Sequence, residues 1–179
     1  MKKFICLIGF TGFLFAKFPL SPQEFLGYEL GEKFTYHHQV IDYFEQVEDA
    51  ADHVQLLHYG YTYEDRPLIV AVITHPKNTQ TLEQIRTNHL INSGLIPGNT
   101  SDQKLAIVWL SYSVHGNESS STEAAMKTLF AFANTSNKTT MEWLKRTIVI
   151  IDPCINPDGR DRYVQFYTMT GNREPNASL

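Results

Sequence analysis

One His-x-x-Glu motif, formed by His115 and Glu118, places two potential metal ligands three residues apart. A neutral imidazole and a carboxylate at this spacing can reach one zinc ion from a tight turn, and Gly116 eases that turn. The motif directly follows an apolar run, residues 105–112, which is typical of a buried strand. Sites in open α/β sheets form at the carboxyl ends of strands. The sequence therefore predicts a metal site at His115 and Glu118, with a chance surface pair as the alternative.

A second polar motif, residues 156–159 (NPDG), follows another apolar run at residues 147–151. Pro, Asp and Gly are turn residues, so the motif predicts a β-turn. Arg160 and Arg162 come directly after it. A guanidinium binds a carboxylate through two parallel hydrogen bonds, so either arginine could face an anionic group of a substrate. Alternatively, Asp161 could neutralise them in a structural ion pair.

The hydrophobic pattern indicates the elements that position these motifs. It predicts helices over residues 34–52, over 81–90 and after 120, and strands over 54–62, 68–74, 105–112 and 147–151. Turn residues between 62 and 68 predict that the first two strands form a hairpin, and residues 92–103 and 134–140 read as polar loops.

The sequence makes more specific predictions for two of these elements, namely the burial of one strand and the cap of one helix. The near-continuous apolar run at 105–112 favours a strand that is buried on both faces. Ser120 and Glu123 form a capping box at the start of the third helix. Alternating strands and helices predict an α/β fold with a mixed, largely parallel central sheet flanked by helices.

Composition limits the class of protein. The 179 residues suffice for one ordinary domain, and 42% apolar with 19% charged residues is a globular composition. The net charge of −4 lacks the basic footprint of a nucleic-acid binder. Two cysteines exclude a disulfide-stapled mini-fold, and Cys154, beside an apolar run, is expected to be a buried, inert thiol.

The N-terminus reads as an export signal. Two lysines precede an uncharged apolar stretch at residues 4–16 that is too short for a comfortable membrane span. We therefore expect a signal peptide at residues 1–16, cleaved after Ala16, and a secreted or periplasmic product with no membrane span. Residues 17–33 would be a lead segment, and residues 34–179 would belong to the folded domain.

In this order, the motifs resemble those of the zinc carboxypeptidases, the M14 metallopeptidase family. The likeness rests on residues 115–118 after a buried strand and on residues 156–159 one strand–helix–strand later. It also includes residues 60–68 (GYTYEDRPL), which are similar to the family's hairpin sequence Gly-x-Ser-x-Glu-Gly-Arg-Pro-Leu. The resemblance extends over about residues 34–170.

The resemblance implies a zinc-dependent exopeptidase that removes C-terminal residues from a peptide or peptide-like substrate. His115 and Glu118 would be the first two zinc ligands, and a second histidine would complete the set around a metal-bound water. A glutamate near the end of the domain would act as general base.

The chain departs from the family pattern in its second half. No histidine follows His115, and the family's catalytic glutamate would lie beyond Leu179. We therefore expect the N-terminal part of a longer enzyme, inactive alone. Arg173, after Asn172, is similar to the arginine of the family's substrate-binding Asn-Arg pair and joins Arg160 as a candidate substrate-binding residue, although exported bacterial members have that pair later. The alternative is a non-catalytic exported binding module.

Overall fold

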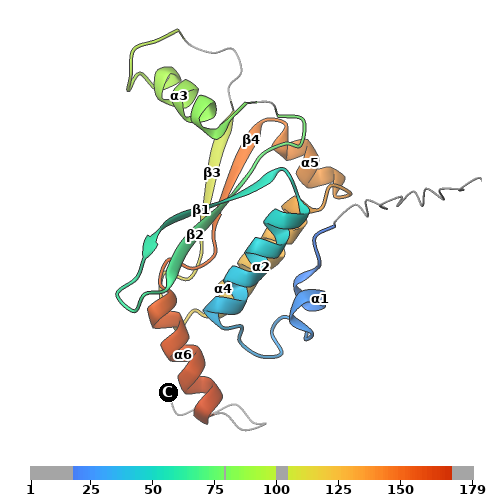
Figure 1. Ribbon diagram of the computed structural model, residues 1–179, viewed down its shortest axis with the longest axis vertical. Coiled ribbons are helices and arrows are strands. Elements are labelled where there is room, and N and C mark those ends of the chain that lie inside the picture. Colours follow the sequence, from blue (N-terminus) through green and yellow to red (C-terminus); the bar gives the residue numbers. More distant parts are fainter. Residues whose placement is uncertain (1–17, 79, 100–104, 171–179) are drawn as a thin grey trace, which may run out of the picture.

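A four-stranded sheet in the order β1-β2-β4-β3 organises the computed structural model, which describes residues 18–78, 80–99 and 105–170 (Figure 1). The strands are β1 (Val54–Tyr61), β2 (Pro67–Ile73), β3 (Ala106–Ser111) and β4 (Thr147–Asp152). β1 pairs with β2 and β2 with β4 in antiparallel fashion, whereas β3 and β4 are parallel. The predicted α/β fold with a mixed sheet is confirmed, and the parallel pairing within the described strands is confined to β3 and β4.

Six helices accompany the described strands. They are α1 (Pro22–Leu26), α2 (His37–Ala50), α3 (Leu82–Asn92), α4 (Ser120–Ala133), α5 (Lys138–Leu144) and α6 (Pro157–Thr170). Helices α2 and α4 lie together against one face of the sheet, and α6 extends away from the sheet below β2 and β4 in the view of Figure 1. The main hydrophobic core lies between α2, α4 and that face.

The predicted helix at residues 34–52 and the predicted hairpin are confirmed as α2 and as the β1–β2 pair. The periodic residues Val40, Ile41, Phe44 and Val47 are all buried, because they form the stripe of α2 that faces the sheet. The predicted helix at 81–90 is α3, which begins at a capping box formed by Thr81.

The prediction that the strand at 105–112 is buried on both faces is wrong for the described chain. β3 is an edge strand, and Ile107, Val108 and Trp109 are 38%, 41% and 64% exposed. An apolar run predicts burial only where other elements cover both faces and the outer edge, and none of the described strands pairs with the outer edge of β3.

The capping-box prediction at Ser120 and Glu123 is also wrong. Helix α4 does begin at Ser120, but the N-cap residue is Ser119, whose side chain makes no capping bond. Glu123 instead points into the protein and accepts a hydrogen bond from the backbone N–H of Thr35 at 2.7 Å. The predicted polar loop at 134–140 is shorter than expected, because α5 begins at Lys138 with Asn137 as its N-cap.

The N-terminal predictions are only partly covered by the structure. The predicted signal peptide, residues 1–16, lies outside the described residues. Within the predicted lead segment the short helix α1 forms, capped by Ser21 and Glu24 and ended at Gly27 with a φ of 74°. Among the described residues, no helix is both long and apolar enough to cross a membrane.

Candidate metal site

The loop after β3 brings His115 and Glu118 together. The backbone N–H of Glu118 donates to the carbonyl of His115 at 3.0 Å, which closes a tight turn around Gly116. In this turn, Nδ1 of His115 lies 3.3 Å from Oε2 of Glu118. The two side chains are 72% and 63% exposed, so they are open to solvent and to a solute.

The chemistry of this pair suits two ligands of one metal ion. An imidazole nitrogen and a carboxylate oxygen are both donors that zinc accepts. In the parts of the chain that the structure describes, no group of three or more His, Cys, Asp or Glu side chains is placed to hold a metal. His115 and Glu118 are thus a pair of candidate ligands, beside which the described chain places no third.

The loop after β4 binds the loop after β3 through main-chain hydrogen bonds. The N–H of Ile155 donates to the carbonyl of Tyr112 at 3.0 Å, and the N–H of Asn156 donates to that of Ser113 at 3.2 Å. The Asn156 side chain adds a third bond, from Nδ2 to the Val114 carbonyl at 3.1 Å. These bonds extend the parallel pairing of β3 and β4 and hold the 156–159 motif beside His115.

The 156–159 motif is the start of helix α6, and the predicted β-turn is wrong. Asn156 caps the helix, because its Oδ1 accepts from the N–H of Gly159 at 3.0 Å. Pro157 is the first helical residue, where its missing N–H costs nothing, and Asp158 lies in the first turn, where a negative charge is favourable.

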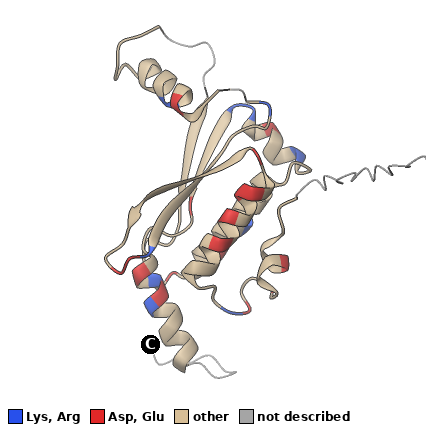
Figure 2. Ribbon diagram, viewed as in Figure 1, with Lys and Arg blue, Asp and Glu red and all other residues tan. Residues whose placement is uncertain are grey.

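The tip of the β1–β2 hairpin joins the same region. Oγ1 of Thr62 donates to Asp158 at 2.6 Å, and Nη1 of Arg66 donates to the same carboxylate at 2.8 Å. Nε of Arg66 reaches Asp161 at 3.0 Å. Burial raises the pKa of Asp158, but the bonds from Thr62 and Arg66 outweigh it and hold that pKa below its usual value. Figure 2 shows charged residues of both signs where the hairpin tip meets the start of α6.

The two arginines that follow the motif differ in exposure. Arg160 is fully buried and bonds to Glu123 and to main-chain carbonyls. Arg162 is 71% exposed and forms an ion pair with Glu64. The alternative, in which Asp161 neutralises both arginines, holds only in part: Asp161 lies 4.0 Å from Arg160, whose nearer partner is Glu123, and Arg162 pairs with Glu64 instead. Arg173 lies outside the described residues.

Sequence reasoning missed a buried polar group beneath the loop. Tyr59 donates its hydroxyl proton to Asp152 at 2.7 Å, and the N–H of Cys154 donates to the same carboxylate at 3.2 Å. Burial raises the pKa of Asp152 despite these bonds, and burial also raises the pKa of the Cys154 thiol. Cys154 is buried as predicted. Its raised pKa disfavours the reactive thiolate.

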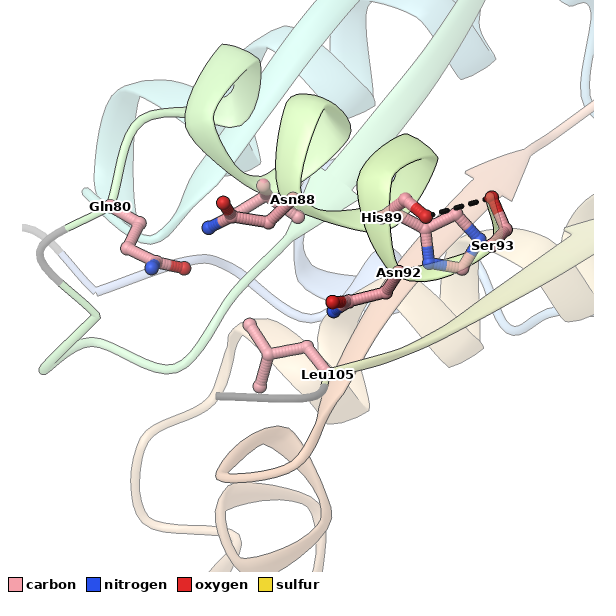
Figure 3. Close-up of a pocket in the computed structure, with 7 residues that line it drawn as sticks. Gln80, Asn88, His89, Asn92, Ser93 and Leu105 are labelled. Atoms are coloured by element: carbon pink, nitrogen blue, oxygen red, sulfur yellow. Dashed lines mark hydrogen bonds between the residues drawn. The ribbon is translucent and has the colours of Figure 1, made fainter. Parts of the chain in front are cut away.

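A hollow beside α3 is remote from this region. It is lined by Gln80, Ile85, Asn88, His89, Asn92, Ser93 and Leu105 (Figure 3). Leu105 precedes β3 and His115 follows it, so the hollow and the His115 loop lie toward opposite ends of that strand. Among these seven described residues, His89 alone carries a titratable side chain.

Comparison with known proteins identifies the family. The family described as zinc carboxypeptidase, peptidase family M14, matches residues 40–178. The chain belongs to the zinc carboxypeptidase family. The match includes all three motifs that meet in the structure, namely the hairpin, the His115 loop and the start of α6.

Solved structures of the same fold agree. Thrombin-activatable fibrinolysis inhibitor superposes with a TM-score of 0.56 at 18% identity, over 74% of this chain and 28% of that protein. Carboxypeptidase A from Helicoverpa armigera gives 0.52 at 18% identity, over 79% and 28%. The bovine fibrinolysis inhibitor, solved with a tick carboxypeptidase inhibitor, gives 0.50 at 20% identity, over 83% and 38%.

These likenesses establish a shared carboxypeptidase fold. The present chain spans only 28–38% of the length of these three relatives. A comparison with curated protein sequences gives no significant match.

Proposed function

We propose that the chain contributes to a zinc-dependent metallocarboxypeptidase, an exopeptidase that hydrolyses C-terminal residues of peptides. The observation that supports this most directly is the 3.3 Å approach of His115 Nδ1 to Glu118 Oε2, at the carboxyl end of a parallel strand in a member of the zinc carboxypeptidase family. When bound, zinc would supply a Lewis acid that activates water and polarises the scissile carbonyl.

The roles of the chain's own residues follow from their placement. His115 and Glu118 would each donate one ligand atom, and the turn closed by the Glu118 N–H would hold those atoms on the solvent-exposed side of the loop. The described residues place no third ligand beside this pair, and two protein ligands hold zinc less firmly than the usual three. The 179-residue chain alone is therefore expected to bind zinc weakly and not to turn over substrate.

The remaining parts of the proposal concern substrate and location. A peptide or peptide-like molecule with a free C-terminal carboxylate is the proposed substrate, and Arg173 remains a candidate to bind that carboxylate. Arg160 is less suited to this role, because its guanidinium is buried and already bonded within the protein. Residues 1–16 are proposed to direct export, so that residues 34–179 act in a secreted or periplasmic domain.

Zinc binding by residues 17–179 tests the ligand assignment. Isothermal titration should give measurable zinc affinity for the unmodified chain and a loss of at least about ten-fold for His115→Ala and for Glu118→Gln, because even the partners of zinc ligands cost this much when removed. His58→Ala is the control, since His58 is exposed on β1. Equal zinc affinity in His115→Ala and in the unmodified chain would contradict the assignment.

Activity separates the proposal from its alternative. The protein isolated from its source should release C-terminal residues from an N-acyl dipeptide, and chelation of zinc should abolish this. If the protein isolated from its source binds such a peptide but does not hydrolyse it, the result would favour the non-catalytic binding module. Rapid hydrolysis by residues 17–179 alone would contradict the expected inactivity of this chain.

A further inference from the structure

Arg160 is a fully buried cation, and each of its three guanidinium nitrogens donates to an acceptor within the protein. Its Nε donates to the carbonyl of Ser119 at 3.1 Å, Nη1 donates to the carbonyl of Thr35, and Nη2 donates to Oε1 of Glu123 at 3.3 Å. Its side chain is 0% exposed. A buried guanidinium with this many directed bonds has little freedom to move toward a solute.

Glu123 completes the arrangement from α4. Its Oε1 accepts the N–H of Thr35 at 2.7 Å as well as the bond from Arg160. The residues before α2, the start of α4 and the start of α6 therefore meet at one buried ion pair. Burial lowers the pKa of Arg160 and raises that of Glu123, and their mutual attraction opposes both shifts.

The bond to Ser119 connects this ion pair to the candidate metal site. Ser119 directly follows Glu118, so Arg160 fixes the Ser119–Ser120 peptide group, one residue beyond that ligand. Gly159, the residue before Arg160, packs against Gly116, which lies between His115 and Glu118 in the sequence. The first turn of α6 thus contacts the loop on both sides of Glu118, once through a backbone contact and once through Arg160.

We propose that Arg160 is a positioning residue, which holds the 115–118 loop in the geometry in which His115 and Glu118 share one metal ion. The metal in this inference rests on the proposed function, whereas the restraint that Arg160 places on the loop does not depend on it. His115 and Glu118 are largely exposed, so their own contacts restrain them little, and the restraint comes from the buried neighbour. Arg160 acts from behind the loop and does not touch the substrate.

The test must separate positioning from general stabilisation, because removing one partner of a buried ion pair leaves an uncompensated buried charge, which destabilises the fold as a whole. Two variants differ in the relevant bond. Arg160→Lys keeps a cation beside Glu123 but loses the separate Nε donor to Ser119, whereas Glu123→Gln removes the charge of the partner and leaves the Ser119 bond in place. Arg162→Lys, at an exposed arginine two residues further along α6, is the matched control.

Amide hydrogen exchange on the metal-free chain supplies the first readout. In Arg160→Lys we expect the amides of Glu118 and Ser121 to exchange about ten-fold faster, relative to the amide of Val72 in β2, because a hydrogen bond to a charged group is lost. Glu123→Gln should change these amides no more than it changes Val72. If the loop amides in Arg160→Lys change only in step with Val72, or if Glu123→Gln loosens them equally, Arg160 is not a positioning residue.

Metal affinity supplies the second readout and keeps the two proposals apart. Zinc affinity, measured by titration at a temperature where all variants are folded, should fall by about ten-fold in Arg160→Lys and remain unchanged in Arg162→Lys. A zinc affinity that is insensitive to His115→Ala would overturn the proposed function, while faster loop exchange in Arg160→Lys would still support positioning of the loop. Slower or unchanged exchange together with zinc binding that depends on His115 would overturn only the role of Arg160.

Discussion

Gly116 and Gly159 lie backbone against backbone, although 43 residues separate them in the chain: a Cβ built on Gly116 would be 2.1 Å from the carbonyl carbon of Gly159. Real Cβ atoms essentially never approach another heavy atom so closely, so only glycine fits at position 116 in this arrangement. The requirement for Gly116 thus comes as much from the start of α6 as from its own turn.

Replacing Gly116 by alanine should separate the loop from α6. We expect Gly116→Ala to lower the free energy of unfolding by about 1–3 kcal/mol, since backbone atoms and not a flexible side chain must move. Gly98→Ala is the control, because the nearest atoms there belong to the flexible side chain of Ile91. Urea unfolding of both variants checks this expectation, and a cost at Gly116 no larger than at Gly98 would contradict the packing described.

Asn156 has two separable roles, and two substitutions distinguish them. Asn156→Ala removes the cap of α6 and the bond to the Val114 carbonyl, and should cost about 1–2 kcal/mol of stability. Asn156→Asp keeps a capping oxygen but loses the Nδ2 donor, so it should retain near-normal stability while the loop at Val114 loosens. Urea unfolding combined with amide exchange near His115 measures both effects.

A second capped helix provides the control for that experiment. Asn137 caps α5 and also donates from its Nδ2, to the carbonyl of Ala131, in a region away from His115. Asn137→Ala should therefore cost a similar amount of stability without changing exchange near His115. If the two alanine variants loosen the His115 loop equally, the bond from Asn156 has no special role there.

Elements that depend on neighbouring residues in the chain match the predictions from sequence, whereas features that depend on distant partners do not. Helix α2 and the hairpin depend on local periodicity and turn residues, and both were predicted near their observed bounds. The spacing of His115 and Glu118 is also local. Their approach in the structure needed only a tight turn after a strand.

The wrong predictions share a dependence on distant partners. Glu123 matched a capping box because the pattern considers four residues, whereas its actual partners are Thr35, 88 residues away, and Arg160, 37 residues away. The apolar run of β3 matched a fully buried strand, but burial depends on what lies beside it in the sheet order. The NPDG motif was ambiguous in itself, since proline and aspartate also favour the first turn of a helix.

Two buried histidines should make the protein less stable in mild acid. Burial lowers the pKa of His37 and of His53, even though each ring also bonds to a main-chain carbonyl. The unfolded chain, with histidine pKa values near about 6.5, then binds protons more readily than the folded one. The stabilising contribution is therefore complete above about pH 6.5 and is lost as the pH falls toward the lowered pKa values.

The pH effect is measured as the free energy of unfolding at pH 7.5 and at pH 5.5. The double variant His37→Gln, His53→Gln should lose less stability between these pH values than the unmodified protein does. His38→Gln with His58→Gln is the control, since both of these side chains are exposed. Asp152 and Glu123, whose pKa values burial raises, remain in every variant and cancel from the comparison. An unchanged pH dependence in the His37, His53 variant would show that these two histidines do not destabilise the folded protein in acid.

The outer edge of β3 should make the 179-residue chain self-associate. β3 has the sequence AIVWLS, without charge, proline or glycine, and so lacks the features that keep natural edge strands from pairing. Trp109 is its most exposed large side chain and lies on the opposite face of the sheet from α2 and α4, next to Ile150 of β4.

Trp109→Gln should weaken self-association by about ten-fold, as expected for a central aromatic contact, and change the free energy of unfolding by no more than about 0.5 kcal/mol. Trp143→Gln, at a tryptophan of similar exposure on α5, should leave association unchanged. Sedimentation over a range of concentrations distinguishes these outcomes, and a chain that stays monomeric throughout, or equal effects of the two substitutions, would exclude pairing through β3.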